Sequence, residues 1–197
     1  MKKINNRTTE YEIEDVFLKR YSPRALSGEA VEIEQLMTVF EAARWAPSAS
    51  NIQPWRFLYA IQGTPDFDLF LSFLMEGNKV WCKNAGALII VLSKKNLDGG
   101  EYNASHLLDT GSAWENLALQ ATSQGLITHA MAGYNKEPLM KELDIKEDEY
   151  EVGLMIAVGK PGDVKSLPEY LQAREAPNDR KKLSEIVFEG KEGAKKL

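Results

Sequence analysis

Residues 43–57, Ala-Arg-Trp-Ala-Pro-Ser-Ala-Ser-Asn-Ile-Gln-Pro-Trp-Arg-Phe, join an amphipathic segment to a run of strand-forming residues. Two prolines, Pro47 and Pro54, stiffen the polar loop between those segments, and the loop carries Ser, Asn and Gln side chains. A loop of this kind presents several neutral donors and acceptors in fixed directions. That arrangement suits a heteroaromatic ring with carbonyl and imide groups, although an ordinary capped loop between a helix and a strand fits the same residues.

Helix-like and strand-like segments alternate on both sides of this loop. Upstream, residues 29–45 place apolar side chains at spacings of three and four, which predicts an amphipathic helix, and Ser27 stands where it can cap that helix. Downstream, residues 55–61 and the continuous apolar run at 87–92 predict strands, the second of them covered on both faces. The other predicted elements are helices at 10–20, 66–75, 105–124 and 136–143, strands at 127–132 and 150–158, and an extended arm from about 163. This alternation predicts an α/β or α+β layered domain.

The helix predicted at 105–124 has apolar or small residues nearly all round it. A helix of that composition is buried on more than one side. In a chain of 197 residues, this predicts a central helix that is shared with a second subunit.

Length and composition favour a single domain over residues 1–197, because 44% hydrophobic and 27% charged residues are typical of globular proteins. The formal net charge of −5 gives no bulk attraction for nucleic acid or anionic lipid. The single cysteine, Cys82, cannot form an internal disulfide, and no apolar run reaches the roughly 18 residues of a membrane span. Because the first residues also lack the apolar stretch of a signal peptide, we expect a soluble, cytoplasmic protein with no membrane or nucleic-acid partner.

Two basic clusters lie far apart in the sequence. Residues 20–24, Arg-Tyr-Ser-Pro-Arg, place two guanidinium groups around a hydroxyl, and residues 178–183, Asn-Asp-Arg-Lys-Lys-Leu, form the second cluster. Guanidinium groups suit a phosphate or a carbonyl-rich ring edge. Each cluster alone is also compatible with a solvated surface charge run. The functional hypothesis is a phosphate site that uses both clusters.

Taken in order, these segments resemble the motifs of the nitroreductase family. The resemblance rests on Arg20-x-Ser22-x-Arg24, the loop at 43–57, Gly77-Asn78-Lys79-x-Trp81, the helix that contains Asp109-Thr110-Gly111, Ala132-Gly133-Tyr134, Ala157-Val158-Gly159-x-Pro161 and Arg180-Lys181-Lys182-Leu183. It spans roughly residues 10 to 190. It implies an α+β, nitroreductase-like fold with a mostly antiparallel central sheet flanked by helices. It also implies a homodimer that packs along the long helix and holds two molecules of flavin mononucleotide (FMN) at its interface.

The resemblance further implies that each cofactor site takes residues from both subunits. One subunit supplies residues 20–24, with Arg20 at the FMN phosphate and Arg24 near the pyrimidine edge, and the other supplies the polar loop. Asn78 would bond the pyrimidine ring, and the backbone near Gly133 would lie by the reactive N5 edge. The complete implied set is Arg20, Tyr21, Ser22, Arg24, Pro47, Ser48, Ala49, Ser50, Asn51, Gln53, Asn78, Ala132 and Gly133, with Arg180 and Lys182 completing the phosphate site.

The implied activity is electron transfer from NAD(P)H through FMN to nitroaromatic, quinone or similar small acceptors by a ping-pong mechanism. A cation such as Arg24 would stabilise the negative charge that a reduced flavin develops. Because the flavin performs the hydride chemistry, we expect no catalytic protein nucleophile and no metal, and we interpret Cys82 as a small packing residue. We expect structural or solvent roles for His106 and His129, with a place at the active-site edge left open for His129.

Two other functions fit the same residues. A relative with this fold and FMN can instead be a dehalogenase, an enzyme that fragments FMN or an oxidase of peptide heterocycles. The second alternative is a flavin-binding dimer without turnover, because every residue in the implied set is a binding residue.

Overall fold

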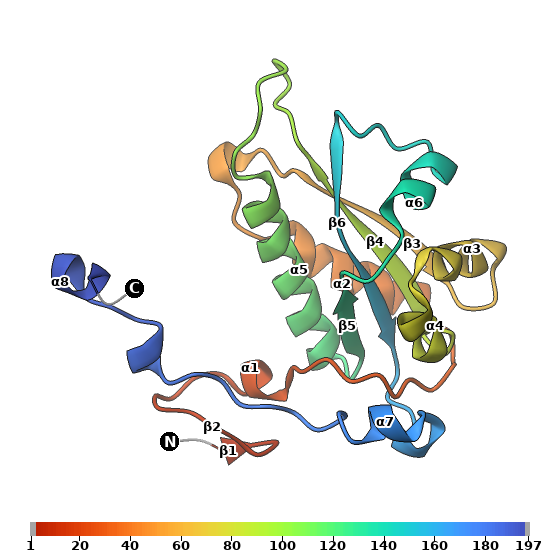
Figure 1. Cartoon of the computed structure of the whole chain (residues 1–197), viewed down its shortest axis with the longest axis horizontal. Helices are drawn as coiled ribbons and strands as arrows, with labels where there is room; N and C mark the ends of the chain where they lie inside the picture. The colour runs from red at the N-terminus through yellow and green to blue at the C-terminus, as the bar shows by residue number, and fades with distance from the viewer. Residues whose placement is uncertain (1–2, 196–197) are drawn as a thin grey trace.

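The computed structural model describes residues 3–195, and its centre is a four-stranded antiparallel sheet with the strand order β3-β4-β6-β5 (Figure 1). The strands are β3 (Trp55–Ile61), β4 (Ala87–Lys94), β5 (Ile127–Met131) and β6 (Tyr150–Gly159). The main helices are α1 (Asp15–Lys19), α2 (Ile33–Arg44), α3 (Pro65–Phe73), α4 (Glu76–Cys82), α5 (His106–Ser123), α6 (Lys136–Glu142) and α7 (Glu169–Gln172). The fold is therefore α+β, with an antiparallel sheet flanked by helices, as the sequence predicts.

The central strand β4 is buried on both faces because successive side chains of a strand point to opposite sides. Ile89 and Val91 belong to a core shared with α2 and α5, whereas Leu88 and Ile90 belong to a core shared with α3, α4 and α6. Within residues 3–195, no helix is long and apolar enough to cross a bilayer.

The predicted start of the second helix and its cap are wrong. The helix α2 begins at Ile33, and Ser27 instead accepts a hydrogen bond from the backbone N–H of Glu29. The chain between them runs extended, because the N–H groups of Gly28 and Val31 donate to backbone carbonyls at positions 84 and 86. Hydrogen bonds to a distant segment therefore keep residues 29–32 out of the helix, although the apolar spacing had assigned them to it.

The long helix α5 buries one side against the sheet. Ala113, Leu117 and Ala118 are fully buried inside the subunit, whereas Leu107 is 50% exposed and Leu108 is 75% exposed. Within one subunit the helix is therefore buried on one side only, and its outer side carries uncovered leucines. The predicted partner subunit for that outer side stays a prediction.

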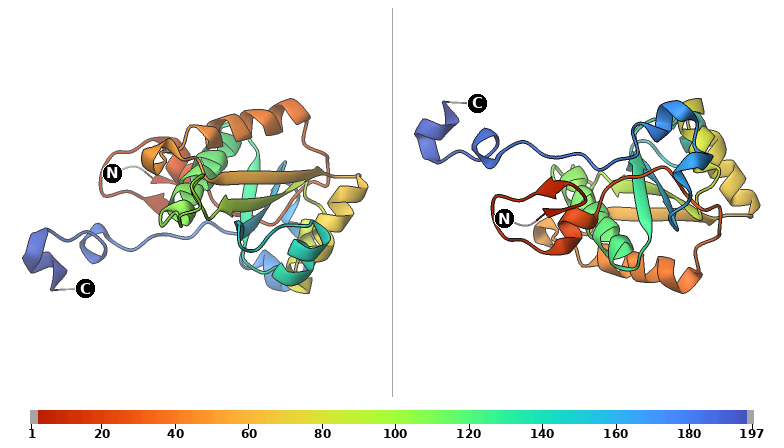
Figure 2. Two further views of the ribbon diagram at one scale, coloured as in Figure 1. Left: turned by 90° about the horizontal axis from the view of Figure 1, so that it is seen from above. Right: turned by 90° about the horizontal axis from the view of Figure 1, so that it is seen from below.

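Both ends of the described chain contain elements that the sequence did not indicate. The strands β1 (Lys3–Ile4) and β2 (Arg7–Thr8) form a small antiparallel hairpin. The tail folds as a 3-10 turn, η2 (Val164–Ser166), and as α7 before it becomes an arm that carries η3 (Leu183–Glu185) and α8 (Gly190–Ala194). Figure 2 shows this arm passing the N-terminal hairpin and projecting away from the sheet.

One glycine in the turn before β4 has no room for a side chain. The N–H of Gly86 donates to the carbonyl of Val158, and a Cβ at this position would lie 2.5 Å from Glu29 O and 2.7 Å from Val31 Cγ2. We expect Gly86→Ala to lower the free energy of unfolding by about 1–3 kcal/mol, because backbone atoms must move. The control is Gly77→Ala in α4, where a Cβ meets nothing within 4 Å and helix propensity favours Ala. Urea denaturation checks both variants, and equal stability of the two would contradict the prediction.

Candidate functional site

Five arginines line one pocket of about 290 Å³, which we call the arginine pocket. They come from three distant segments and are Arg7, Arg20, Arg24, Arg174 and Arg180. Glu175 is the only carboxylate among the lining residues that the structure describes. Because like charges repel at short range, such an excess of guanidinium groups favours an anionic ligand.

Arg7 joins the three segments of the arginine pocket. Its Nε donates to the carbonyl of Asn178 at 2.9 Å, and its Nη1 donates to the carbonyls of Leu18 at 3.1 Å and Arg20 at 2.5 Å. Burial and the nearby charges of Arg180 and Arg20 lower the pKa of Arg7. The guanidinium groups are therefore close enough to raise one another's electrostatic energy.

The segment after α1 places Arg20 and Ser22 together. Arg20 Nη1 donates to Ser22 Oγ at 3.3 Å, and Arg20 Nε lies 4.0 Å from Glu115 Oε1 on α5. Tyr21 also lines the pocket, and burial together with the charge of Glu175 raises its pKa, so its hydroxyl stays protonated.

Arg24 lies beside Glu175. One carboxylate oxygen of Glu175 accepts hydrogen bonds from the backbone N–H groups of Arg24 and Ala25, the second at 2.6 Å. The other oxygen lies 3.8 Å from Arg24 Nη1. This carboxylate thus fixes both the backbone and the charge environment of Arg24.

His129 on β5 lines the arginine pocket, whereas its place at an active-site edge stays a prediction. Its Nδ1 lies 3.2 Å from the carbonyl of Pro23, and its ring packs on Trp81 with the centroids 4.7 Å apart. Burial and the charge of Arg24 lower the pKa of His129, so the imidazole is neutral at pH 7.

Burial also raises the pKa of the Cys82 thiol, which makes Cys82 a neutral packing residue. His106 is only 3% exposed, so of the two roles expected for it the solvent role is wrong and the structural role remains.

The lowered pKa of His129 predicts how stability changes with pH. The unfolded chain, whose histidine titrates near about pH 6.5, binds more protons than the folded chain below that value. The contribution of the neutral His129 to the free energy of unfolding is therefore fully present above about pH 6.5. This contribution is lost as the pH drops below that value, by up to about 1.4 kcal/mol per pH unit. His106 adds to this loss, because burial lowers its pKa as well. We expect His129→Gln to reduce the slope of unfolding free energy against pH between about pH 5 and 6.5, and an unchanged slope would contradict the assignment.

The polar loop is held by Asp109 in the first turn of α5. Asp109 Oδ2 accepts hydrogen bonds from Ser48 Oγ at 3.1 Å and from the N–H of Ala49 at 3.0 Å, and Ser48 Oγ accepts from the N–H of Gln53 at 2.8 Å. Ser50, at φ 50°, lies in the left-handed region inside the 3-10 turn η1 (Ala49–Asn51). None of the residues 47–53 lines the arginine pocket. Within one subunit, the structure therefore does not bring the loop and the arginines together.

Asn78 and Gly133, two residues of the implied cofactor set, contact each other directly. Asn78 Nδ2 donates to the carbonyl of Gly133 at 2.9 Å, and this carbonyl also accepts from the N–H of Met75. Neither residue lines the arginine pocket, but α4 carries both Asn78 and Trp81, and Trp81 packs on His129 of the pocket wall. Ala132, next to Gly133, is exposed. This pair therefore lies outside the arginine pocket, next to the helix whose Trp81 packs on His129.

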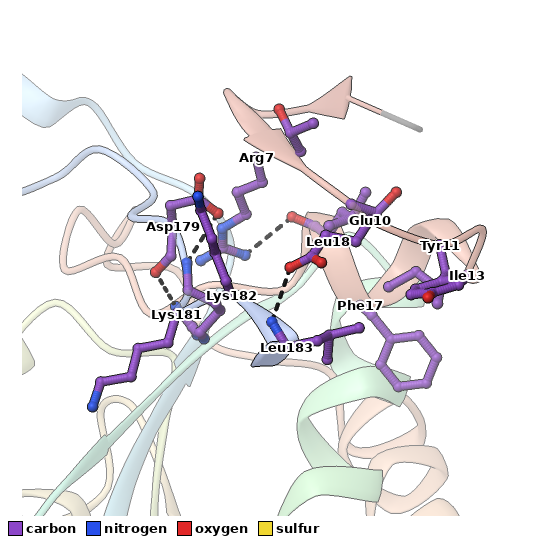
Figure 3. Close-up of a pocket in the computed structure, with 13 residues that line it drawn as sticks. Arg7, Glu10, Tyr11, Ile13, Phe17, Leu18, Asp179, Lys181, Lys182 and Leu183 are labelled. Atoms are coloured by element: carbon purple, nitrogen blue, oxygen red, sulfur yellow. Dashed lines mark hydrogen bonds between the residues drawn. The ribbon is translucent and has the colours of Figure 1, made fainter. Parts of the chain in front are cut away.

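A second, larger cavity of about 690 Å³ separates the N-terminal segment from the arm, and we call it the arm groove (Figure 3). Arg180 borders both cavities, whereas Lys182 borders only the arm groove. Glu10 accepts a hydrogen bond from the N–H of Leu183 at 2.9 Å, and this bond links the N-terminal segment to the arm across the groove. Of the two basic residues that the tail was predicted to supply to the phosphate site, the structure thus places Arg180 in the arginine pocket and Lys182 beside it.

Sequence reasoning missed three charged residues of the arginine pocket, namely Arg7, Arg174 and Glu175. Arg174 is a further basic residue six positions before Arg180, and that spacing was a usable signal. No sequence pattern connects Arg7 with Asn178 or Glu175 with Arg24, because these contacts span 171 and 151 positions. Among residues 3–195, no group of three or more His, Cys, Asp or Glu side chains is arranged to hold a metal ion.

Comparisons with known proteins identify relatives of the chain and of its fold. The family model described as "Nitroreductase family" matches residues 17–66 and 63–160. A crystal structure described as an oxidoreductase containing FMN is 42% identical, covers 97% of this chain and 98% of its own, and superposes with a TM-score of 0.93. A structure described as a "putative nitroreductase in complex with FMN", from Desulfovibrio desulfuricans, is 25% identical, covers 92% and 98%, and gives a TM-score of 0.73. A Streptococcus pyogenes serotype M6 protein named "Putative NAD(P)H nitroreductase" is 25% identical over 189 residues, which cover 77% of this chain and 90% of that protein.

Proposed function

Since the chain belongs to the nitroreductase family, we propose that it is an FMN-dependent oxidoreductase that passes electrons from NAD(P)H to a small acceptor, such as a nitroaromatic compound or a quinone. The observation that carries this proposal is the arginine pocket. Segments around positions 7, 20 and 180 converge on it, so the fold gathers cations that the sequence keeps far apart. FMN carries a phosphate dianion that requires such groups.

The donors of the arginine pocket fit a phosphate at its outer end. Arg7 uses Nε and Nη1 on backbone carbonyls, so its role is to hold the pocket together. Arg20 and Arg180 are the cations that we assign to the phosphate, with Ser22 as a hydroxyl donor and Lys182 approaching from the arm groove. The proposed site thus combines both basic clusters of the sequence.

We place the ring system of the cofactor where Arg24 and His129 line the pocket, next to α4. When bound, FMN supplies the hydride-accepting and hydride-donating chemistry. We assign Arg24 to the pyrimidine edge, where its positive charge stabilises a reduced flavin. We assign Asn78 and the backbone at Gly133 to hydrogen bonding with the ring, and the buried Trp81 to excluding water from that end.

We propose a homodimer, in which the loop at residues 47–53 contacts the FMN that the partner's arginine pocket holds. Three observations support this arrangement. The loop does not reach the arginine pocket of its own chain, Leu108 on α5 is 75% exposed, and the arm exposes Ile186 and Val187 to 56% and 64%. A second copy of the chain would cover these apolar surfaces. If both substrates use one flavin face within such a site, they must bind in turn, which gives ping-pong kinetics.

The experiment that tests the proposed function is an absorption spectrum of the protein, with FMN added if it is colourless, before and after anaerobic NADH or NADPH. We expect a bound flavin that bleaches on addition of one of these donors and recovers its colour with a quinone. Bound flavin that does not bleach would favour a relative with other chemistry or a binding protein without turnover. Absence of flavin binding would reject the proposal.

A further inference from the structure

Glu175 is a buried carboxylate with one unengaged oxygen. The residue is 8% exposed, and its Oε1 accepts hydrogen bonds from the backbone N–H groups of Arg24 and Ala25. Its Oε2 is buried and has no hydrogen-bond partner among the described residues. The nearest cation is Arg24, whose Nη1 lies 3.8 Å from this oxygen.

A separation of 3.8 Å is an ion pair but not a hydrogen bond. Among residues 3–195, no side-chain hydrogen bond engages the guanidinium of Arg24, and this side chain is 24% exposed in the arginine pocket. The guanidinium N–H groups of Arg24 are thus available to a ligand. The positive charge of Arg24 is partly offset by Glu175, which backbone hydrogen bonds hold in place.

A purely structural role does not explain this carboxylate. The two backbone N–H groups need only one acceptor oxygen, which the amide of a glutamine also provides. Burying a charge costs free energy unless that charge is paired, so the negative charge of Glu175 needs a reason of its own. The second oxygen, directed at Arg24, supplies that reason.

We propose that Glu175 is a positioning residue that sets, through Arg24, how strongly the protein stabilises reduced FMN, and thereby sets the reduction potential of the bound flavin. This inference rests on the proposed function. A carboxylate close to a partly buried guanidinium lowers the field which that guanidinium exerts on a ligand. A reduced flavin carries negative charge, which a nearby cation stabilises. Glu175 therefore keeps the flavin easier to reoxidise than Arg24 alone would.

The test compares Glu175→Gln with the wild-type protein, both loaded with FMN. The glutamine keeps the acceptor for the two N–H groups and removes the charge. We expect the equilibrium with a reference redox dye, measured anaerobically, to shift about tenfold toward reduced flavin, which is about 30 mV for a two-electron couple. The matched control is Glu115→Gln, which removes a half-exposed carboxylate 4.0 Å from Arg20 and should leave the equilibrium unchanged.

A double-mutant cycle shows whether the effect passes through Arg24. We expect Arg24→Gln, at saturating FMN, to shift the equilibrium toward oxidised flavin, and the effect of Glu175→Gln to shrink in that background. A wild-type equilibrium in Glu175→Gln would overturn the inference, as would an equal shift with and without Arg24. If Glu175→Gln fails to fold, Arg24→Gln decides alone, since no shift in that variant would remove the basis of the inference. If the wild-type protein binds no FMN, the proposed function fails first.

Discussion

Gly111→Arg is expected to convert the protein into a monomer that has lost FMN. Gly111 is exposed on α5, and a Cβ at this position meets nothing within 4 Å, so the fold of the single subunit tolerates a side chain there. In the proposed dimer the same side of α5 faces the partner, where an unpaired charge costs several kcal/mol. Because each FMN contacts both chains, we expect its dissociation constant to rise by at least about a hundredfold.

Sedimentation of the variant and its visible absorption spectrum check this prediction together. The matched control is Ser72→Arg, which places the same side chain on the exposed surface of α3, and α3 belongs to the core on the opposite face of the sheet. That variant should keep the oligomeric state and the flavin of the wild-type protein. A well-folded Gly111→Arg monomer with full FMN affinity would rule out the shared site. Ala118, by contrast, is fully buried in its own subunit, so substitution there would test the core rather than the interface.

Arg20→Ala is expected to weaken FMN binding roughly 10- to 100-fold while leaving riboflavin binding unchanged. A hydrogen bond to a charged group contributes about 1.5–3 kcal/mol, and riboflavin lacks the phosphate that we assign to Arg20. Arg180→Ala should show the same selectivity. Fluorescence titration of the apoprotein with both flavins gives the two dissociation constants.

Lys141→Ala is the matched control for loss of a positive charge. Lys141 lies exposed on α6, outside both cavities, and its removal should leave both dissociation constants unchanged. Equal weakening of FMN and riboflavin by Arg20→Ala would contradict the phosphate assignment, since it would indicate a general loss of structure.

The strands of the central sheet and the long helix could be predicted because local patterns determine them. The predicted strand at 55–61 matches β3 at both ends, and the apolar run at 87–92 lies within β4. The helix α4 was not predicted, because Gly77 and Asn78 are poor helix formers. Its formation depends on tertiary contacts, including the burial of Trp81 and the hydrogen bond from Asn78 to Gly133.

The candidate site could be predicted only where its residues form local clusters. Arg20 and Arg180 were expected at one phosphate site, and the structure places both in the arginine pocket. Glu175 could not be connected with Arg24, because the bond between them depends on how the tail returns across the sheet. The contact between the polar loop of one subunit and the arginine pocket of the other requires a dimer, and it stays a prediction.

The hydrogen bond from Arg7 to Asn178 also makes the arginine pocket depend on the last part of the chain to be synthesised. All four strands of the sheet end at or before Gly159, so a shorter product that lacks the arm still contains the whole sheet. The arginine pocket takes Arg180 from the arm, so it is incomplete until that position has been translated. Under the proposed function, a translation product that stops between these positions would contain all four strands and bind no flavin, so bound flavin would mark the chains that include the arm.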